Sequence, residues 1–253
     1  MTLLKKLIAA LTLVPALVFA EGGYVLDKAP ERTKSIAALQ NGAKLFVNYC
    51  LNCHSASSMR YNRLRDIGLT EDQIKTNLLF ASDKVGDLMK VTMAPKDAKE
   101  WFGAAPPDLS VISRAKSSEL GSGPDYIYTY LRTYYKDETR PTGWNNLVYP
   151  NVAMPHVFWD LQGVRTAKFV NEKDPHDASK TVHRFEKFET VKPGKLTQLE
   201  YDTAVADLVG FMEWMAEPAA AKRKQLGVWV LLFLGVFSFL AWMLGKTYWK
   251  AVK

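Results

Sequence analysis

Two cysteines and a histidine lie within five consecutive residues, Cys50-Leu51-Asn52-Cys53-His54, and no other stretch constrains this chain as strongly. The CxxCH pattern is the attachment signature of a c-type haem. The two thiols add to the vinyl groups of the porphyrin, and the histidine reaches the iron from the same short turn. The motif therefore predicts one covalently bound haem c, attached through Cys50 and Cys53, with His54 as one axial iron ligand.

Two other uses of paired cysteines fit the sequence less well. A structural zinc site needs a second pair of ligands, and Cys50 and Cys53 are the only cysteines in the chain. A thioredoxin-like redox pair follows a β-strand in a βαβ unit, whereas this motif follows a helical pattern. Haem attachment is therefore the favoured interpretation.

The net charge of +7 suggests a nucleic-acid binder until its distribution is considered. Residues 1–20 contain two lysines and no acid, and residues 222–253 contain six basic residues and no acid. Without these eight, the 33 basic residues fall to 25 against 26 acidic residues, so the middle of the chain is nearly neutral. The positive charge belongs to segments that flank a membrane, and we expect no nucleic-acid partner.

Residues 1–20 have the organisation of a secretory signal peptide. Lys5 and Lys6 precede an apolar run from Leu7 to Phe19, and the small residue Ala20 offers a cleavage position. An uncleaved N-terminal anchor is the alternative, but the run is shorter than the ~20 residues that span a bilayer. Export suits the haem motif, because bacteria attach haem c outside the cytoplasmic membrane.

A second apolar segment, from Leu226 to Gly245, carries no charge. At about 1.5 Å per residue, a helix of this length covers about 30 Å, which is the thickness of a bilayer core. Basic residues flank it equally on both sides, so the predicted signal peptide decides the orientation. We expect a single pass through a bacterial inner membrane, with the haem domain in the periplasm. The expected boundaries are a signal peptide at 1–20, a haem domain at 21–221, a basic flank at 222–225, an anchor at 226–245 and a cytoplasmic tail at 246–253.

Between the two ends, several segments have helical patterns. From Ser35, apolar residues on one face carry a helix into the haem motif. Capping boxes at Thr70 and Thr197 begin two further helices, which end near Phe80 and at Glu217. The other expected helices are 59–66 with Gly68 as its C-cap, a short piece between Gly86 and Pro95, and one that starts at 123–125.

The segment 103–110 contains two adjacent prolines and allows two interpretations. The simpler one places Pro107 at or near the first position of a helix. In the other, the rigid segment forms a wall of the haem pocket and offers a backbone carbonyl to the free ring nitrogen of His54. The residues of this segment alone favour the helix start.

An electron carrier needs a second axial ligand, and Met154 lies beside a proline in an expected loop. A neutral thioether favours ferrous iron and raises the reduction potential. Met93, in a similar Met-Ala-Pro sequence, is a rival, and a methionine that only packs is the ordinary alternative. Bis-histidine ligation stays open as well, with candidates His156, His176 and His183.

Residues 160–196 lose the helical period. Thr166–Asn171 and His183–Val191 alternate weakly as two strands, with the polar residues 172–177 between them. We expect a surface hairpin. Its acidic residues could steer a basic partner, although a solvated loop is the simpler interpretation.

Together these features resemble one family, cytochrome c1, the haem subunit of the cytochrome bc1 complex. The resemblance runs from about Leu39 to the C-terminus and is weakest over 157–196. It depends on the haem motif, a PPDLS segment, a distant methionine–proline pair, and a W-x-A-E-P helix end before a single anchor. The matching residues are Gly42, Cys50, Cys53, His54, Ser55, Tyr61, 106–110, Arg114, Tyr126, Met154, Pro155 and 214–218.

The resemblance implies a mainly α fold. Its parts are a cytochrome c-like haem domain enlarged by insertions, such as the small hairpin, and one C-terminal transmembrane helix. The haem would lie between His54 and Met154. Pro107 and Tyr126 would contribute to the pocket, and Arg114 would lie near a haem propionate.

This chain departs from the family pattern at two positions. The family often has an arginine at the position of Lys116, and a lysine keeps the charge but cannot form the bidentate contact. Propionate pairing by Lys116 is therefore less favourable, and Arg114 could share it. Where the family has a second proline after the ligand, this chain has His156, so a histidine lies close to the ligand loop.

The implied function is electron transfer from a Rieske iron–sulfur protein to this haem and on to a c-type cytochrome, beside cytochrome b in the lipid bilayer. Such outer-sphere chemistry needs no nucleophile or general acid, so we expect an electron-transfer subunit that is not catalytic alone. One alternative is an anchored cytochrome that serves an oxidase or another reductase. Others are a haem enzyme or gas sensor with a vacant sixth iron position, and a purely structural membrane subunit.

Overall fold

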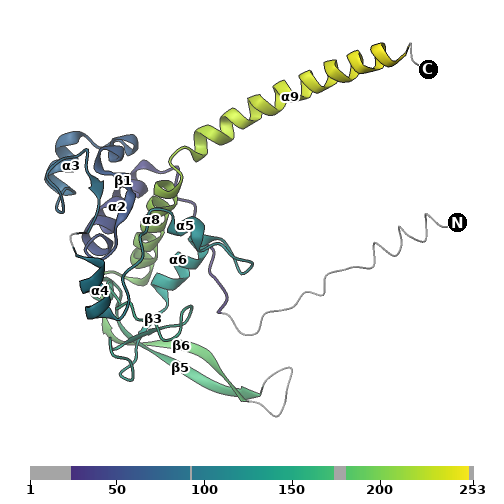
Figure 1. Cartoon of the computed structure of the whole chain (residues 1–253). Helices are drawn as coiled ribbons and strands as arrows, with labels where there is room; N and C mark the ends of the chain where they lie inside the picture. Colours follow the sequence, from purple (N-terminus) through teal and green to yellow (C-terminus); the bar gives the residue numbers. More distant parts are fainter. Residues whose placement is uncertain (1–23, 92, 174–180, 251–253) are drawn as a thin grey trace.

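The computed structural model describes residues 24–91, 93–173 and 181–250. The first half contains α2 (Ile36–Leu45), the π-helical turn η1 (Phe46–Cys50), β1 (Ala56–Arg60), the 3-10 helix η2 (Tyr61–Ile67), α3 (Glu71–Asn77), β2 (Leu88–Met89), α4 (Pro95–Phe102) and α5 (Ile112–Ala115). The second half contains α6 (Gly123–Arg132), β3 (Tyr134–Lys136), β4 (Trp144–Asn146), α7 (Trp159–Gln162), β5 (Gly163–Lys173), β6 (Thr181–Pro193), α8 (Gln198–Ala216) and α9 (Ala220–Trp249). The expected mainly helical class is confirmed (Figure 1). The predicted signal peptide and His176 lie outside the described residues.

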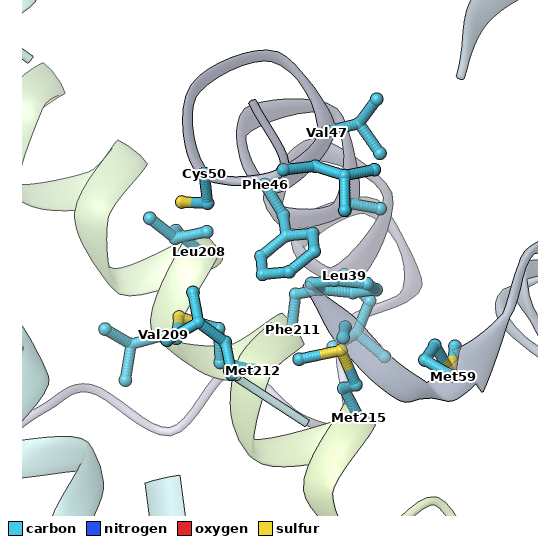
Figure 2. Packing of buried hydrophobic residues seen from close by; sticks show 14 of the residues in the cluster. Leu39, Phe46, Val47, Cys50, Met59, Leu208, Val209, Phe211, Met212 and Met215 are labelled. Carbon is cyan, nitrogen blue, oxygen red and sulfur yellow. The ribbon is translucent and has the colours of Figure 1, made fainter. Parts of the chain in front are cut away.

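Helices α2 and α8 pack against each other at the centre of the hydrophobic core. The rings of Phe46 and Phe211 lie with their centroids 5.6 Å apart. Figure 2 shows Leu39 and Cys50 together with Leu208 in the same buried cluster. Because burial of each large apolar side chain contributes about 1.5–3 kcal/mol, this contact contributes strongly to the stability of the segment that carries the haem motif.

Gly42 lies where the two helices come very close. A Cβ atom at this position would lie 2.2 Å from the carbonyl oxygen of Asp207 and 2.6 Å from the Cβ of Phe211. Only glycine avoids these clashes, so its missing side chain sets the spacing of α2 and α8. The path of α2 toward Cys50 depends on that spacing.

Side chains at the helix starts confirm the predicted capping boxes. Thr70 accepts a hydrogen bond from the Gln73 amide, Thr197 accepts one from the Glu200 amide, and both reciprocal bonds are present. Helix α3 ends at Asn77, slightly before the predicted end near Phe80. Each such cap contributes about 1 kcal/mol, because it satisfies amide groups that the helix itself leaves without partners.

Arg132 ties α6 to α8 and to the N-terminal segment. Its Nε lies 2.6 Å from Asp202 Oδ1, and one terminal nitrogen lies 2.9 Å from the other oxygen of that carboxylate. A third contact joins its other terminal nitrogen to Asp27 at 2.6 Å. The bidentate geometry is the stronger form of such a pair, so α6 is held against α8 at its C-terminal end.

The predicted hairpin is confirmed and is longer than expected. Strands β5 and β6 pair antiparallel from Gly163 with Pro193 to Lys173 with Thr181, and the hairpin extends away from the helices (Figure 1). At its base, the buried Arg165 donates a hydrogen bond from Nε to the Tyr134 carbonyl at 3.0 Å. This bond joins the hairpin to β3, so the hairpin has a fixed attachment to the domain.

Two predicted helices are wrong in part. The stretch that was expected to be helical from Met59 begins as β1, and only from Tyr61 does it become a 3-10 helix that ends at Gly68 with φ 83°. The expected helix between Gly86 and Pro95 contains the strand β2 instead. Strands β1 and β2 pair with each other, and a tertiary pairing of this kind outweighs weak local helix propensity.

Helix α9 extends away from the folded domain (Figure 1). Among the described residues it is the one helix long and apolar enough to cross a membrane, with a mean hydropathy of 2.2 in its most apolar window. None of that window is buried against the rest of the chain. The predicted apolar span at 226–245 lies inside this longer helix.

Replacement of Gly42 by alanine should destabilise the domain. The added methyl group must push α2 away from α8, and overfilling of a packed contact usually costs about 1–3 kcal/mol. Thermal unfolding of the purified protein should show a lower melting temperature for Gly42→Ala. The matched control is Gly86→Ala, because a Cβ there meets nothing within 4 Å. Equal melting temperatures for the two variants would contradict the proposed role of Gly42.

Candidate haem site

The CxxCH motif lies in a tight turn directly after a change of helix type. Helix α2 widens into η1 and ends at Cys50, and short π-helical turns of this kind often lie at functional sites. The amides of Cys53 and His54 then donate to the carbonyl of Cys50 at 3.1 and 2.8 Å. These bonds close the turn, so the two thiols and the imidazole are held within one short stretch of backbone.

The two cysteines are free thiols in different surroundings. Cys50 is buried, and burial, together with the nearby Cys53, raises the pKa of its thiol to about 12. Cys53 is half-buried. Neither thiol is joined in a disulfide, so both are available to react.

His54 is oriented by a backbone carbonyl 53 residues later in the chain. Its Nδ1 lies 2.7 Å from the carbonyl oxygen of Pro107. Because a carbonyl only accepts hydrogen bonds, Nδ1 must carry a proton, and in the neutral ring Nε2 then keeps its lone pair. Burial lowers the pKa of His54, although the Pro107 carbonyl and Asp108 oppose this effect. The imidazole is therefore neutral at neutral pH, with Nε2 available as a ligand atom.

The Pro107 carbonyl is held in place by hydrogen bonds to the segment that follows the motif. Asp108 accepts hydrogen bonds from the backbone amides of Ser57 and Ser110, both at 2.8 Å. The amide of Leu109 donates to the carbonyl of Ser55 at 2.8 Å. The prolines stiffen this segment and Asp108 positions it, so the carbonyl that faces His54 has little freedom to move.

The expectation that Pro107 starts a helix is wrong, because α5 begins only at Ile112. Residues 108–110 form hydrogen bonds with residues after the haem motif, and these bonds hold the segment in a non-helical conformation. The other interpretation, in which this segment offers a carbonyl to His54, describes the geometry that the structure has. Short-range proline statistics could not reveal a partner 53 residues away.

Met154 is contacted by two tyrosines. The hydroxyl of Tyr130 lies 3.5 Å from Met154 Sδ, and the hydroxyl of Tyr134 lies 3.2 Å from the Met154 carbonyl oxygen. The two hydroxyl oxygens are themselves 2.7 Å apart. Met154 lies in the loop between β4 and α7, called the methionine loop below. Its side chain therefore contacts α6 and its backbone contacts β3.

Two buried asparagines give the methionine loop its shape. Asn145 Oδ1 accepts from the amide of Asn151 at 2.8 Å, and Asn146 Oδ1 accepts from the amide of Val148 at 2.9 Å. The side chain of Asn146 also donates to the Tyr130 carbonyl at 2.7 Å. These bonds replace the regular hydrogen bonds that a loop lacks. The adjacent asparagines were the available sequence signal, since asparagine commonly bonds to nearby backbone in turns.

The model of the Cytochrome C1 family matches residues 28–252 of this chain. The chain belongs to the cytochrome c1 family. A cytochrome c1 from Allochromatium vinosum is 44% identical over 98% of this chain and 100% of its own length. A protein named ammonia monooxygenase gamma subunit, from Nitrosomonas europaea, is 45% identical over the full length of both chains. A cytochrome c1 from Rhodospirillum rubrum is 30% identical over 100% of this chain and 99% of its own.

Membership of the cytochrome c1 family confirms the resemblance drawn from the motifs. It implies a haem c cofactor, electron transport and a place in the cytochrome bc1 complex. The residues present fit such a cofactor. Cys50 and Cys53 are free to form thioethers, and the hydrogen bond to Pro107 selects the His54 tautomer whose Nε2 can bind iron.

The family position that often holds an arginine is occupied by Lys116, and the structure places this lysine beside Tyr126. Its Nζ lies 4.9 Å from the centre of the Tyr126 ring, and both residues line a cavity of about 240 Å³. Arg114 is exposed on α5. The ring of Tyr126 stacks on that of Tyr130, with centroids 6.0 Å apart. The structure thus connects Lys116, Tyr126, Tyr130 and Met154 through successive contacts.

The three other ligand candidates that lie among the described residues have different surroundings. Met93 lies half-buried just before α4, and His183 is exposed on β6. His156 is buried and stacks on Tyr134, with ring centroids 4.7 Å apart. Burial lowers its pKa to about 3, and the nearby Gln162 does not form a hydrogen bond of normal geometry with it. His156 thus packs as a neutral aromatic ring.

Replacement of Asp108 by alanine should weaken the segment that presents the Pro107 carbonyl. Two hydrogen bonds to backbone amides are lost, and we expect the free energy of unfolding to fall by about 1 kcal/mol, a low value because the side chain is exposed. Thermal unfolding at neutral pH measures this difference. Asp83→Ala, at another exposed aspartate, is the control and should unfold like the unchanged protein.

The effect of Asp108→Ala should also depend on pH. Burial raises the pKa of Asp108, but the hydrogen bonds from Ser110 and Ser57 outweigh burial and lower it below 3.8. The stabilisation is therefore present above pH 3.8 and is lost as the pH falls through the folded-state pKa. The difference between the two proteins should shrink below about pH 4. A difference that stays constant down to pH 2 would contradict this account.

Proposed function

We propose that this chain is a membrane-anchored c-type cytochrome that relays single electrons within a cytochrome bc1 complex. The electron would come from a Rieske iron–sulfur protein and pass to a c-type cytochrome. The observation that carries the proposal is the hydrogen bond from His54 Nδ1 to the Pro107 carbonyl, within a chain of the cytochrome c1 family. That bond leaves Nε2 of the CxxCH histidine free to bind iron.

Each site residue has a role in this proposal. Cys50 and Cys53 would attach one haem c, and His54 and Met154 would bind its iron. When bound, haem c supplies a ferric–ferrous couple that accepts and releases one electron. The hydrogen bond to Pro107 keeps the His54 ring in one orientation, and the tyrosine contacts keep Met154 in place. Because neither ligand needs to move during electron transfer, reorganisation of the protein stays small.

The anchor has a functional purpose in this proposal. Helix α8, which packs against the helix of the haem motif, ends at Ala216, and α9 begins at Ala220. So short a connection keeps the haem domain near the membrane surface. We propose that α9 crosses a bacterial inner membrane once, that the haem domain faces the periplasm, and that residues 246–253 are cytoplasmic. The predicted signal peptide at 1–20 supports this orientation.

Two other assignments remain testable. An anchored cytochrome that serves an oxidase or another reductase would purify with those subunits instead of with a multispanning b-type cytochrome. The name of the 45% identical relative, ammonia monooxygenase gamma subunit, suggests another partner. Purification of the intact membrane complex, with identification of its subunits and haems, distinguishes these possibilities. Cytochrome b and a Rieske protein should be present if the proposal is correct.

Replacement of Met154 by alanine should remove the near-infrared absorption band of methionine–iron ligation. The haem potential should fall by on the order of 0.1 V, a part of the ~0.8 V range that axial ligands span. Absorption spectroscopy and redox titration of the purified complex measure both effects. The matched control is Met93→Ala, which removes the other methionine that precedes an Ala-Pro sequence. Loss of the band in Met93→Ala and its persistence in Met154→Ala would reverse the assignment.

Carbon monoxide binding separates the relay from a haem enzyme or gas sensor. A closed sixth position resists the gas, so the reduced native protein should bind it slowly or not at all, whereas Met154→Ala should bind it rapidly. Optical difference spectra of the two reduced proteins provide the measurement. Rapid binding to the native protein would favour a vacant sixth position, as in the gas-sensor alternative.

The chain purified alone should not oxidise quinol. Nothing in the sequence suggests a quinone pocket, so we expect turnover to require the other subunits of the complex. A quinol oxidation assay of the isolated chain, beside an equal amount of the whole complex, tests this expectation. Activity of the isolated chain with quinol would contradict its assignment as an electron-transfer subunit.

A further inference from the structure

Three tyrosines spaced four residues apart form a continuous column from α6 to β3. Tyr126 stacks on Tyr130 with the ring planes 11° apart, and Tyr130 meets the edge of Tyr134 with ring centroids 5.3 Å apart. Tyr126 and Tyr130 lie on the same face of α6, and this spacing alone is typical of a packed core face. The hydroxyl groups of Tyr130 and Tyr134 indicate a role beyond packing, because both contact Met154 in the methionine loop.

The distances indicate the direction of the hydrogen bonds. The Tyr134 hydroxyl has one proton and two acceptors within reach, the Tyr130 oxygen at 2.7 Å and the Met154 carbonyl at 3.2 Å. The shorter distance is that of a normal O–H···O bond and the longer one exceeds its usual range, so the proton belongs between the tyrosines. Tyr130 then accepts from Tyr134, and its own proton is free for Met154 Sδ, 3.5 Å away.

We propose that Tyr130 is a positioning residue for Met154. Its hydroxyl donates a hydrogen bond to Met154 Sδ, and this bond raises the reduction potential of the haem. The inference rests on the proposed function, because it requires Met154 to be a ligand. A thioether sulfur has two lone pairs, so one can bind iron while the other accepts a weak hydrogen bond. Such a bond withdraws electron density from the sulfur, and a poorer donor favours ferrous over ferric iron.

Tyr134 strengthens the hydrogen bond from Tyr130 to Met154 Sδ. A hydroxyl that accepts a hydrogen bond becomes a better donor, so the bond from Tyr134 polarises the Tyr130 hydroxyl toward the sulfur. A phenol keeps its proton at neutral pH, so the donor is present under ordinary conditions. The carbonyl of Tyr130 is held by Asn146 at 2.7 Å, and this bond fixes the backbone from which the ring projects. The hydroxyl therefore has both a partner that activates it and a fixed position.

The substitution Tyr130→Phe separates the hydroxyl from the ring. Phenylalanine keeps the ring and its stacking with Tyr126 and Tyr134, so the fold of the loop should be preserved. Tyr128→Phe is the matched control. Tyr128 lies on the same helix, is equally a tyrosine, and faces Arg132, whose guanidinium lies 4.5 Å from its ring. Both variants lose one hydroxyl from α6, and only one of these hydroxyls contacts Met154.

The experiment is redox titration and near-infrared spectroscopy of the purified complex with each variant. We expect Tyr130→Phe to keep the methionine–iron band at an altered wavelength and to shift the midpoint potential downward. Tyr128→Phe should match the unchanged protein in both measurements. A Tyr130→Phe variant with an unchanged or higher potential would overturn the inference. Melting temperatures of both variants verify that any shift does not arise from unfolding.

Failure of the proposed function gives a different result. If the unchanged protein lacks the methionine–iron band, or if Met154→Ala leaves that band intact, then Met154 is not a ligand and the proposed function is wrong at that point. If the unchanged protein has the band and Met154→Ala loses it, a Tyr130→Phe variant with an unchanged potential overturns only the role of the hydroxyl. The two failures therefore cannot be confused.

Discussion

The contact between α2 and α8 at Gly42 is the constraint on which the rest of the structure depends. A glycine is required there because any side chain would meet the backbone of Asp207. The close approach lets Phe46 reach Phe211, and η1 then delivers the haem motif at a fixed place. Since α8 continues after three residues into the apolar helix α9, the same contact ties the candidate haem site to the membrane anchor.

The two candidate iron ligands are positioned by irregular backbone and not by regular secondary structure. His54 depends on a carbonyl in a non-helical proline segment, and Met154 lies in a loop. Such segments have no regular hydrogen bonds of their own, so short polar side chains supply them: Asp108 for the first loop and Asn145 for the second. The body of the domain is helical, but the positions of His54 and Met154 depend on these few hydrogen bonds between side chains and backbone.

The predictions that were wrong share a physical cause. Residues near Met59, and between Gly86 and Pro95, have compositions that fit short helices, yet they pair as β1 and β2. Pro107 fits a helix start, yet its neighbours pair with the segment after the haem motif. In each case the intrinsic helix propensity differs by only tenths of a kcal/mol per residue. A tertiary hydrogen bond or a buried contact therefore decides the conformation.

The sequence by itself determined the haem motif, the capped helices and the apolar span, because each depends on residues within about one or two helical turns. The family resemblance followed from those local motifs and is confirmed by full-length similarity. Only the tertiary structure decided that the Pro107 carbonyl meets His54, that Tyr130 meets Met154, and that His156 is buried without a hydrogen-bond partner among the described residues. These contacts join residues distant in the chain, or depend on which surfaces become buried, and no short-range pattern encodes either.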